Sequence, residues 1–221
     1  MKYDILETKE RISADNEKVA EETRKLLKEK KVFFANLMAS PGAGKTTLLT
    51  QVIKHLKDKY RIGVMEADVD SDVDAKTISD LGVKVIQLHS AGLCHMDADM
   101  TYRGLEQFGM DDVDIIFLEN IGNLVCPAEF DVGASKKVMI LSVPEGDDKP
   151  LKYPLMFQVS DICLINKIDA KEVFDFDKER FIKNAHQQNP NLTIIPVSAL
   201  TGEGIQTFID WLENEMEEWR K

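Results

Sequence analysis

The chain has few of the residues that form disulfide bonds or ligate metals, with only 3 cysteines and 4 histidines among 221 residues. An odd count of three leaves at least one cysteine unpaired and is too small for a disulfide framework. No apolar run reaches the ~20 residues of a membrane-spanning helix. Residues 1–31 also lack the apolar segment of a signal peptide. We therefore expect a cytoplasmic protein with no membrane partner.

Positive charge is also in short supply. The chain carries 28 Lys and Arg against 39 Asp and Glu, a formal net charge of −11. Nucleic-acid binding requires clustered basic side chains, so this balance argues against a nucleic-acid partner. Any phosphate that the protein binds must be held by local geometry. The hydrophobic content of 43% is ordinary for a chain that buries one large core.

Short apolar runs alternate with helical patterns along the chain, which indicates an α/β fold. Runs rich in Val, Ile, Leu and Phe predict strands at 32–38, 61–67, 84–88, 113–118, 137–143, 161–165 and 193–197. Helices are expected near 45–56, 97–107, 151–157, 177–187 and 205–219. This alternation predicts three α/β/α layers around a mostly parallel sheet, with ligands at the carboxyl ends of the strands.

The N-terminal segment has a different pattern from the rest. Residues 15–30 carry apolar side chains among charges and predict an amphipathic helix that packs on the core through Val19, Ala20, Leu26 and Leu27. No internal repeat or low-complexity linker follows. We expect two parts, an N-terminal helical extension at 1–31 and a single domain at 32–221.

A glycine-rich turn follows the first predicted strand of this domain and precedes a helix. Backbone N–H groups of such a turn converge on an anionic oxygen, and the helix dipole adds positive potential. Lys45 can reach the β- and γ-phosphates, and the Thr46 hydroxyl can ligate Mg²⁺. Ala39 stands where the usual pattern has glycine, so the match is to a relaxed P-loop. We expect a nucleoside triphosphate held by Ser40, Pro41, Gly42, Ala43, Gly44, Lys45, Thr46 and Thr47.

Two later segments point to guanine as the base. Asn166-Lys167-Ile168-Asp169 follows the strand at 161–165 and resembles the NKxD motif of GTPases. The Asp169 carboxylate can accept paired hydrogen bonds from guanine N1–H and its exocyclic amine, which adenine does not offer in that arrangement. Lys167 can lie along the ring and Asn166 can brace the loops. Ser198-Ala199-Leu200 resembles the remaining base-contacting loop, so GTP is favoured over ATP.

The strand at 113–118 ends in a segment that resembles the DxxG element of GTPases. In Glu119-Asn120-Ile121-Gly122 a glutamate replaces the usual aspartate. Because Glu is one methylene longer, we expect Glu119 to approach Mg²⁺ through a water molecule, while the Gly122 N–H faces the γ-phosphate.

An acidic stretch after the second predicted strand is expected to form a switch loop. Its carboxylates are Glu66, Asp68, Asp70, Asp72 and Asp74, and such residues are by default solvated loop charges. We select Asp68 and Asp74, one to hold the Mg²⁺ shell and one to orient the attacking water, in either order. No arginine is recognisable as a transition-state finger, so the predicted intrinsic hydrolysis is slow.

The cysteines and one histidine suggest a metal site. Cys94 and His95 are adjacent, and Cys126 follows the Glu119–Gly122 segment, so two strand-end loops can bring two thiolates and an imidazole together. That donor set suits Zn²⁺ or Ni²⁺ and does not choose between them. A Cys-His dipeptide alone is also compatible with ordinary packing. Cys163 lies within a predicted strand and is interpreted as a core residue, and no ligand pattern surrounds His55, His89 or His186.

Together, segments 39–46, 92–97 and 119–127 resemble the HypB family, the nickel-insertion GTPases of nickel–iron hydrogenase maturation in the SIMIBI class of P-loop GTPases. The resemblance implies dimerisation with GTP and a metal site of Cys94, His95 and Cys126 at the dimer interface. It also implies nickel delivery to the hydrogenase large-subunit precursor. Residues 1–31 contain neither cysteine nor histidine, unlike the metal-binding N-terminal motifs of some relatives. Nickel is therefore expected from a HypA-type metallochaperone or at the switch-linked site alone.

The spacing of Gly122 and Cys126 suggests a linkage between nucleotide and metal. A γ-phosphate that tightens the loop at 119–122 would shift a metal ligand, and the effect on binding would be reciprocal. Lys149 and Lys152 lie where a basic side chain can reach a partner subunit's nucleotide, although ordinary solvated lysines are the favoured explanation. Three alternatives remain: a urease accessory GTPase, a metal-buffering protein with a structural nucleotide, and a signalling GTPase with no metal role.

Overall fold

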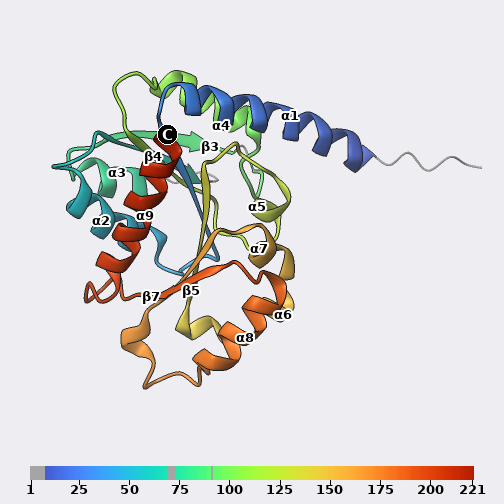
Figure 1. Cartoon of the computed structure of the whole chain (residues 1–221), viewed down its shortest axis with the longest axis vertical. Coiled ribbons are helices and arrows are strands. Elements are labelled where there is room, and N and C mark those ends of the chain that lie inside the picture. Colours follow the sequence, from blue (N-terminus) through green and yellow to red (C-terminus); the bar gives the residue numbers. More distant parts are fainter. Residues whose placement is uncertain (1–7, 69–72, 91) are drawn as a thin grey trace, which may run out of the picture.

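The computed structural model describes residues 8–68, 73–90 and 92–221, with a seven-stranded sheet at its centre (Figure 1). The order is β3-β2-β4-β1-β5-β6-β7, and each neighbouring pair is parallel. All carboxyl ends of the strands therefore meet at one edge of the sheet. The predicted strands are confirmed, with ends shifted by a residue or two, as β1 Phe33–Ala39, β2 Ile62–Asp68, β3 Lys84–His89, β4 Ile115–Glu119, β5 Lys136–Ser142, β6 Ile162–Asn166 and β7 Thr193–Pro196.

Helices cover both faces of this sheet, as the α/β/α prediction requires. The buried strand β1 sends Phe33 and Leu37 into one apolar cluster and Phe34 and Met38 into the clusters on the opposite face. The first face is covered by α2 Lys45–Leu56, α3 Val73–Ser79 and α9 Ile205–Arg220. The second is covered by α1 Thr8–Glu29, α4 Ala98–Phe108, α5 Cys126–Glu129, α7 Pro154–Val159 and α8 Lys178–Gln188.

The helix predicted at 151–157 is wrong in detail. Two short helices occupy this region, α6 Lys149–Lys152 and α7, separated by Tyr153. Pro154 has no N–H to continue the first helix, and its fixed φ suits the first turn of the next. The helices α3 and α5 were not predicted, since seven and four residues are too few to display a period.

The helix α1 lies along α4 on the second face (Figure 1). Ala20 and Leu27 are buried, as the sequence predicts, and Leu26 packs partly against the same cluster. Polar contacts fix the helix as well. Asn16 accepts from the Ala98 N–H and donates to the Asp131 carbonyl, each at 2.8 Å, and α1 is thereby tied to the body of the molecule.

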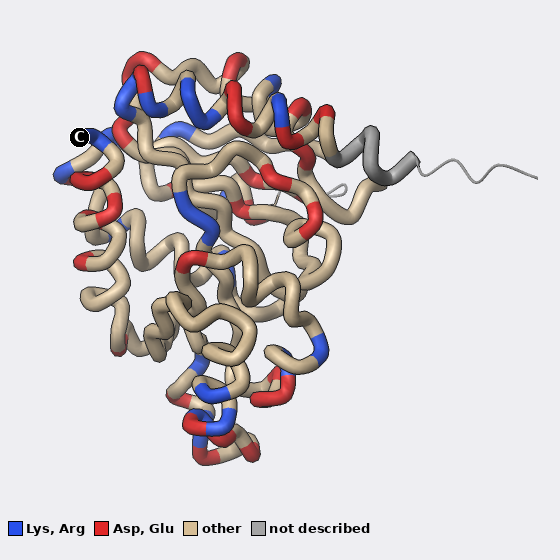
Figure 2. Tube along the Cα trace, turned by 45° about the vertical axis from the view of Figure 1, so that its right-hand side comes forward, with Lys and Arg blue, Asp and Glu red and all other residues tan. Residues whose placement is uncertain are grey.

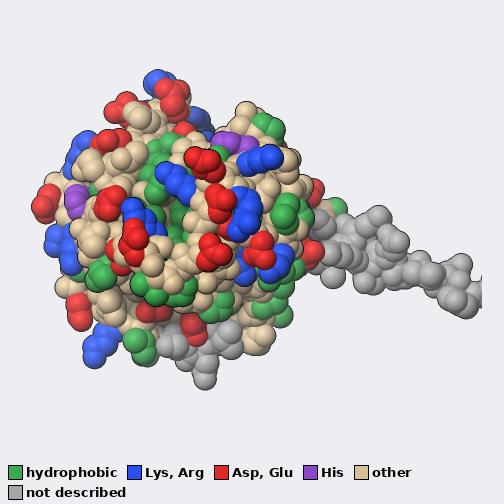
Figure 3. Space-filling view, turned by 90° about the horizontal axis from the view of Figure 1, so that it is seen from below, with side chains coloured by type: hydrophobic (Ala, Val, Ile, Leu, Met, Phe, Trp, Pro, Cys, Tyr) green, Lys and Arg blue, Asp and Glu red, His purple; other side chains and the backbone are tan. Residues whose placement is uncertain are grey.

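Acidic and basic residues are interspersed over the tube in Figure 2 and over the face in Figure 3. Several are paired, including Arg24 with Asp131 at 2.7 Å and Arg180 with Asp147 at 2.6 Å. Within the described ranges, every helix is too short or too polar to cross a bilayer.

Candidate functional site

The glycine-rich turn lies between the carboxyl end of β1 and the first turn of α2. Gly42 and Gly44 have φ values of 75° and 96°, which L side chains rarely adopt. A Cβ on Gly44 would also lie 2.6 Å from Asn166 Nδ2. Glycine at this position therefore permits both the turn and the close approach of β6. The turn places Lys45 and Thr46 at the N-terminus of α2, where the helix dipole would stabilise a bound phosphate.

The predicted base-recognition segments meet beside this turn. Asn166 donates from Nδ2 to the Ala43 carbonyl at 2.9 Å and accepts from the Ala199 N–H at 3.0 Å. Lys167 donates to the Gly42 carbonyl at 2.7 Å. The Ser198 hydroxyl donates to Asp169 Oδ1 at 2.5 Å. The end of β6, the loop after β7 and the phosphate loop thus form one connected surface.

Other predicted residues of this region lie at its rim. Pro41, Thr47, Asp169 and Leu200 are exposed, whereas Ser198 is buried. The exposed side chains face solvent. Buried Ser198 ties the loop after β7 to the segment after β6 through its hydrogen bond with Asp169.

A polar cavity opens on the other side of the phosphate loop. It collects the predicted catalytic residues, and Thr46 adds a hydrogen bond from Oγ1 to Glu119 Oε1 at 2.8 Å. Gln87 and Asn120 also contribute, although no sequence pattern selects them. The described lining residues are Lys45, Glu66, Ala67, Asp68, Asp74, Gln87, Glu119, Asn120 and Gly122. The acidic residues Asp70 and Asp72 lie outside the described residues.

Two buried carboxyl groups face each other in this cavity. Glu66 on β2 and Glu119 on β4 are register partners, only 3% and 4% exposed. Burial raises the pKa of both groups, and Lys45 opposes the shift. Glu66 Oε1 and Glu119 Oε2 have no hydrogen-bond partner. Carboxyl oxygens without a hydrogen-bond partner, beside a threonine hydroxyl, are oxygen ligands of the kind that Mg²⁺ prefers. These residues therefore fit a magnesium site. Sequence reasoning missed Glu66 because it was interpreted as the start of a solvated acidic stretch.

A further carboxylate supports the phosphate loop and was also missed. Glu145 accepts a short hydrogen bond from the Ser40 hydroxyl. Its other oxygen accepts from the Ser142 N–H at 2.7 Å, as part of a capping box at the end of β5. The Ser-x-x-Glu spacing was a readable signal for the cap, but not for the contact with Ser40.

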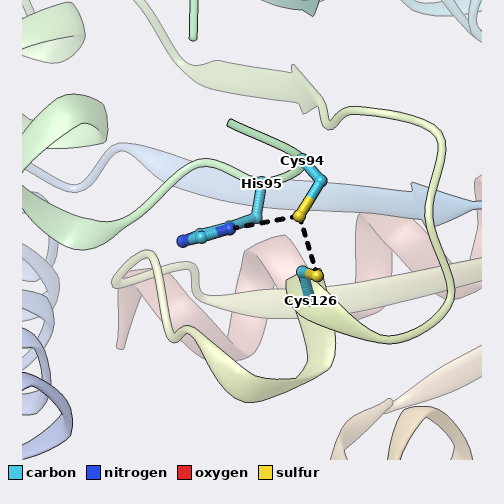
Figure 4. Close-up of side chains that lie close together, drawn as sticks. All are labelled: Cys94, His95 and Cys126. Atoms are coloured by element: carbon cyan, nitrogen blue, oxygen red, sulfur yellow. Dashed lines mark hydrogen bonds between the residues drawn. The ribbon is translucent and has the colours of Figure 1, made fainter. Parts of the chain in front are cut away.

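Figure 4 shows Cys94, His95 and Cys126, the candidate metal ligands, brought together from two loops. Cys94 Sγ lies 2.9 Å from Cys126 Sγ and 3.8 Å from His95 Nδ1. All three ligand-type atoms lie within 4.8 Å of one another. The His95 ring stacks on Phe130 with a centroid separation of 3.9 Å, which fixes its plane.

The electrostatics of this cluster suit a metal. Burial lowers the pKa of His95 and favours the neutral imidazole that ligates metals. The neighbouring Cys94 thiol and partial burial raise the pKa of Cys126, so the Cys126 thiol stays protonated until a cation displaces its proton. Cys163 is fully buried in β6, where burial raises the pKa of its thiol, and it is the core residue that the sequence predicts.

Together, the strand, glycine-rich turn and helix, with the Asn166 brace beside them, define a P-loop nucleotide-binding domain. Residues 33–196 match the family model described as "CobW/HypB/UreG, nucleotide-binding domain". The chain belongs to the CobW/HypB/UreG family of P-loop GTPases, within its HypB group of hydrogenase maturation factors. The family resemblance drawn from the motifs is thereby confirmed.

Named relatives cover most of the chain. The hydrogenase maturation factor HypB of Rhizobium leguminosarum bv. viciae is 43% identical over 209 residues, which are 95% of this chain and 70% of the relative. That of Escherichia coli (strain K12) is 42% identical over 211 residues, 96% of this chain and 73% of the relative. The probable HypB of Methanocaldococcus jannaschii is 35% identical, with 97% of each chain covered.

Two solved structures are similar to the whole fold. HypB from Archaeoglobus fulgidus has a TM-score of 0.85 at 36% identity, covering 92% of this chain and 99% of that one. HypB from Helicobacter pylori, solved in complex with nickel, has a TM-score of 0.86 at 33% identity, covering 92% and 96%.

Proposed function

We propose that this chain is a GTP-hydrolysing metallochaperone that delivers nickel to the hydrogenase large-subunit precursor. The observation that carries the proposal is that one loop, from Glu119 to Cys126, contributes to both the phosphate cavity and the Cys94–His95–Cys126 cluster. The nickel complex of the Helicobacter pylori relative supports nickel as the cargo. Zn²⁺ competes for the same donors.

In this proposal GTP lies on the phosphate loop with its base against Asp169. Lys45 neutralises the β- and γ-phosphates, and the Gly122 N–H faces the γ-phosphate. Thr46 and Glu119, with Asp68 and Asp74, hold Mg²⁺ and orient the attacking water. Mg²⁺ supplies charge neutralisation to the transferring phosphoryl group. No arginine is among the described residues that line the cavity, and the proposed intrinsic hydrolysis is accordingly slow.

The metal site is proposed to lie at the interface of a GTP-promoted homodimer. Three ligands leave at least one coordination position open for a partner. Leu93 and Val125, directly beside the ligands Cys94 and Cys126, are 43% and 49% exposed. Exposed apolar side chains around a ligand cluster are typical of an interaction surface. Nickel would be received there from a HypA-type metallochaperone.

Three earlier predictions remain part of the proposal. These are a cytoplasmic location, a division into an extension at 1–31 and a GTPase domain at 32–221, and a role for Lys149 and Lys152 toward the partner's nucleotide. In the single chain, Lys152 pairs with Asp148 and Lys149 lies over the Tyr153 ring.

A related activity is the main alternative. A HypB of Helicobacter hepaticus, 38% identical over 209 residues, is described as a hydrogenase/urease maturation factor. The urease precursor is therefore the second candidate recipient. Nickel transfer from the purified protein to each precursor, measured by elemental analysis, distinguishes the two.

Two variants separate catalysis from metal binding. Lys45→Ala removes the cation that neutralises the phosphates, so GTP turnover should fall to background while nickel binding stays within about twofold of wild type. Cys126→Ala removes one thiolate, so nickel affinity should drop by more than about 100-fold while nucleotide binding is retained. Colorimetric phosphate release and isothermal titration calorimetry provide the two measurements.

The control is Cys163→Ala, which removes a thiol outside the cluster. Nickel affinity that survives Cys126→Ala would contradict the metal site. Phosphate release that survives Lys45→Ala would not come from this phosphate loop. The metal-buffering alternative, in which the nucleotide is only structural, would then remain.

A further inference from the structure

The segment between the phosphate cavity and the Cys94–His95–Cys126 cluster is anchored by hydrogen bonds of Asn123. Its backbone N–H donates to the carbonyl of Ala39, the last residue of β1, at 2.8 Å. Its side-chain Nδ2 donates to the Cys94 carbonyl at 3.3 Å, and its Oδ1 accepts from the Val125 N–H at 2.8 Å. Asn123 therefore contacts the start of the phosphate loop and both ligand-bearing loops.

The residues before Asn123 leave this loop little freedom against the phosphate loop. A Cβ on Gly122 would lie 3.0 Å from the Pro41 nitrogen, so the two backbones are already in contact. The Asn120 N–H donates to the Leu37 carbonyl at 3.0 Å. A displacement of Pro41 by a bound phosphate is therefore transferred to Gly122 and through its peptide to Asn123.

The residues after Asn123 lead to the metal ligands. Val125, whose N–H bonds to Asn123, precedes Cys126 at the first position of α5. The Cys94 carbonyl belongs to a loop that is also held through the Ser90 hydroxyl, which donates to the Leu93 carbonyl at 2.7 Å. An amide is suited to this bridge because it offers a donor and an acceptor on one planar group.

We propose that Asn123 is the positioning residue that couples the nucleotide state of the phosphate loop to the geometry of the Cys94–Cys126 pair. This inference rests on the proposed function, because it assigns to one side chain the linkage between GTP and nickel. The backbone bond to Ala39 transmits the position of the phosphate loop, and the side-chain amide passes it to both thiol-bearing loops.

The test is the nickel affinity of the full chain, measured by chelator competition with GDP and with a non-hydrolysable GTP analogue. In wild type the two affinities should differ by about 5- to 150-fold, the usual range of coupling between sites. In Asn123→Ala the ratio should fall below about twofold. The affinity for the GTP analogue without nickel should stay near wild type, because the backbone bond to Ala39 remains.

Two further variants sharpen the result. Asn123→Asp keeps an acceptor for the Val125 N–H but places a carboxylate oxygen against the Cys94 carbonyl, so it should lose the coupling as the alanine variant does. It also serves if the alanine variant fails to fold. Asn191→Ala, at an exposed position before β7 on the opposite edge of the sheet, should keep the wild-type ratio.

Each outcome bears on one of the two proposals. A wild-type ratio near one would overturn the linkage in the proposed function. A wild-type ratio that persists in Asn123→Ala and Asn123→Asp would overturn the role of Asn123 alone, even if nickel binds more weakly in both nucleotide states. A ratio that collapses in both variants and survives in Asn191→Ala supports the positioning role.

Discussion

Asn166 and Asp169 lie in different environments within the predicted base-recognition segment. Asn166 is 1% exposed, and both ends of its amide are bonded within the protein. Asp169 lies three residues later with an exposed carboxylate. A buried and fully bonded amide braces loops, whereas an exposed carboxylate is available to a ligand. We therefore propose that discrimination among bases belongs to Asp169.

Replacement of Asp169 by asparagine should change the base that is preferred. The carboxylate can accept two hydrogen bonds from guanine, each worth about 1.5–3 kcal/mol to a charged group. The substitution Asp169→Asn puts an amide in place of that carboxylate and should thus weaken GTP binding by at least about tenfold. Xanthosine triphosphate, which has a carbonyl in place of the exocyclic amine, should gain affinity from the new N–H donor.

Competition between fluorescent GTP and each unlabelled nucleotide measures this exchange. Asp210→Asn, an exposed change of the same chemistry on α9, is the matched control and should leave GTP affinity unchanged. An unaltered order of nucleotide preference in Asp169→Asn would exclude a direct contact with the base.

The candidate site residues that could be selected from the sequence lie in short continuous motifs. The phosphate loop, Asn166–Asp169 and Cys94–His95 are continuous motifs, so their chemistry is legible before folding. Glu145 was missed because its contact with Ser40 joins positions 105 residues apart. Asn123 was not selected for a similar reason, since its side chain donates to the carbonyl of Cys94, 29 positions away. Such contacts depend on loop conformation, which no local pattern specifies.

At the scale of elements, long and strongly patterned segments were predictable and short ones were not. Every predicted strand is present because apolar runs bounded by turn residues are a strong signal. The order of the strands was not predicted, since the sequence does not state which strands are neighbours. The helix α5 has only four residues, yet it carries Cys126 at its start. A functional element can therefore fall below the length at which periodicity is visible.

The docking of α1 depends on an acidic residue outside the helix. Asp131 is paired with Arg24 of α1 and with Lys137 of β5. Burial alone would raise the pKa of Asp131, but Lys137, the Gly133 N–H and Arg24 outweigh it and hold the pKa below its usual value. The ionised carboxylate therefore stabilises the folded chain.

Asp131→Asn should lower the free energy of unfolding at pH 7 by about 1–3 kcal/mol, because charge-assisted hydrogen bonds are lost. The pKa of Asp131 is lowered on folding, so its contribution is complete above the ordinary value near 4 and disappears as pH falls through the lowered value. Wild type and variant should converge in that acidic window.

Urea unfolding at a series of pH values tests this prediction. Asp112→Asn is the control, since the Asp112 side chain is fully exposed and lies 3.6 Å from Arg61. It should change stability by less than about 0.5 kcal/mol. Identical neutral-pH curves for wild type and Asp131→Asn would show that the ion pairs do not secure α1.

At the scale of the whole molecule, the parallel sheet gathers both sites at one edge. The phosphate loop follows β1, the base segment follows β6, and the loop to Cys126 follows β4. The sequence predicted this convergence from the alternation of strands and helices. It left the distance between the two sites open, because that distance depends on how the loops after β3 and β4 fold.

Assembly should respond to the nucleotide. With Mg²⁺ and a non-hydrolysable GTP analogue, light scattering should report about twice the 25.0 kDa mass of the chain, whereas GDP should leave the mass of one chain. Val125→Asp places a charge on an exposed apolar side chain beside Cys126 and should weaken the assembly. An analogue-bound protein that remains a single chain at micromolar concentration would contradict the proposed dimer.

Trp219 gives the protein a built-in optical reporter. Its indole N–H donates to the Val32 carbonyl at 2.8 Å, its ring lies edge-on to Phe33, and Lys28 of α1 sits over it. Release of α1 would uncover this indole to water and shift its emission to the red. Both tryptophans of the chain, Trp211 and Trp219, are on α9. Intrinsic fluorescence can therefore follow the leading helix in real time without any attached dye.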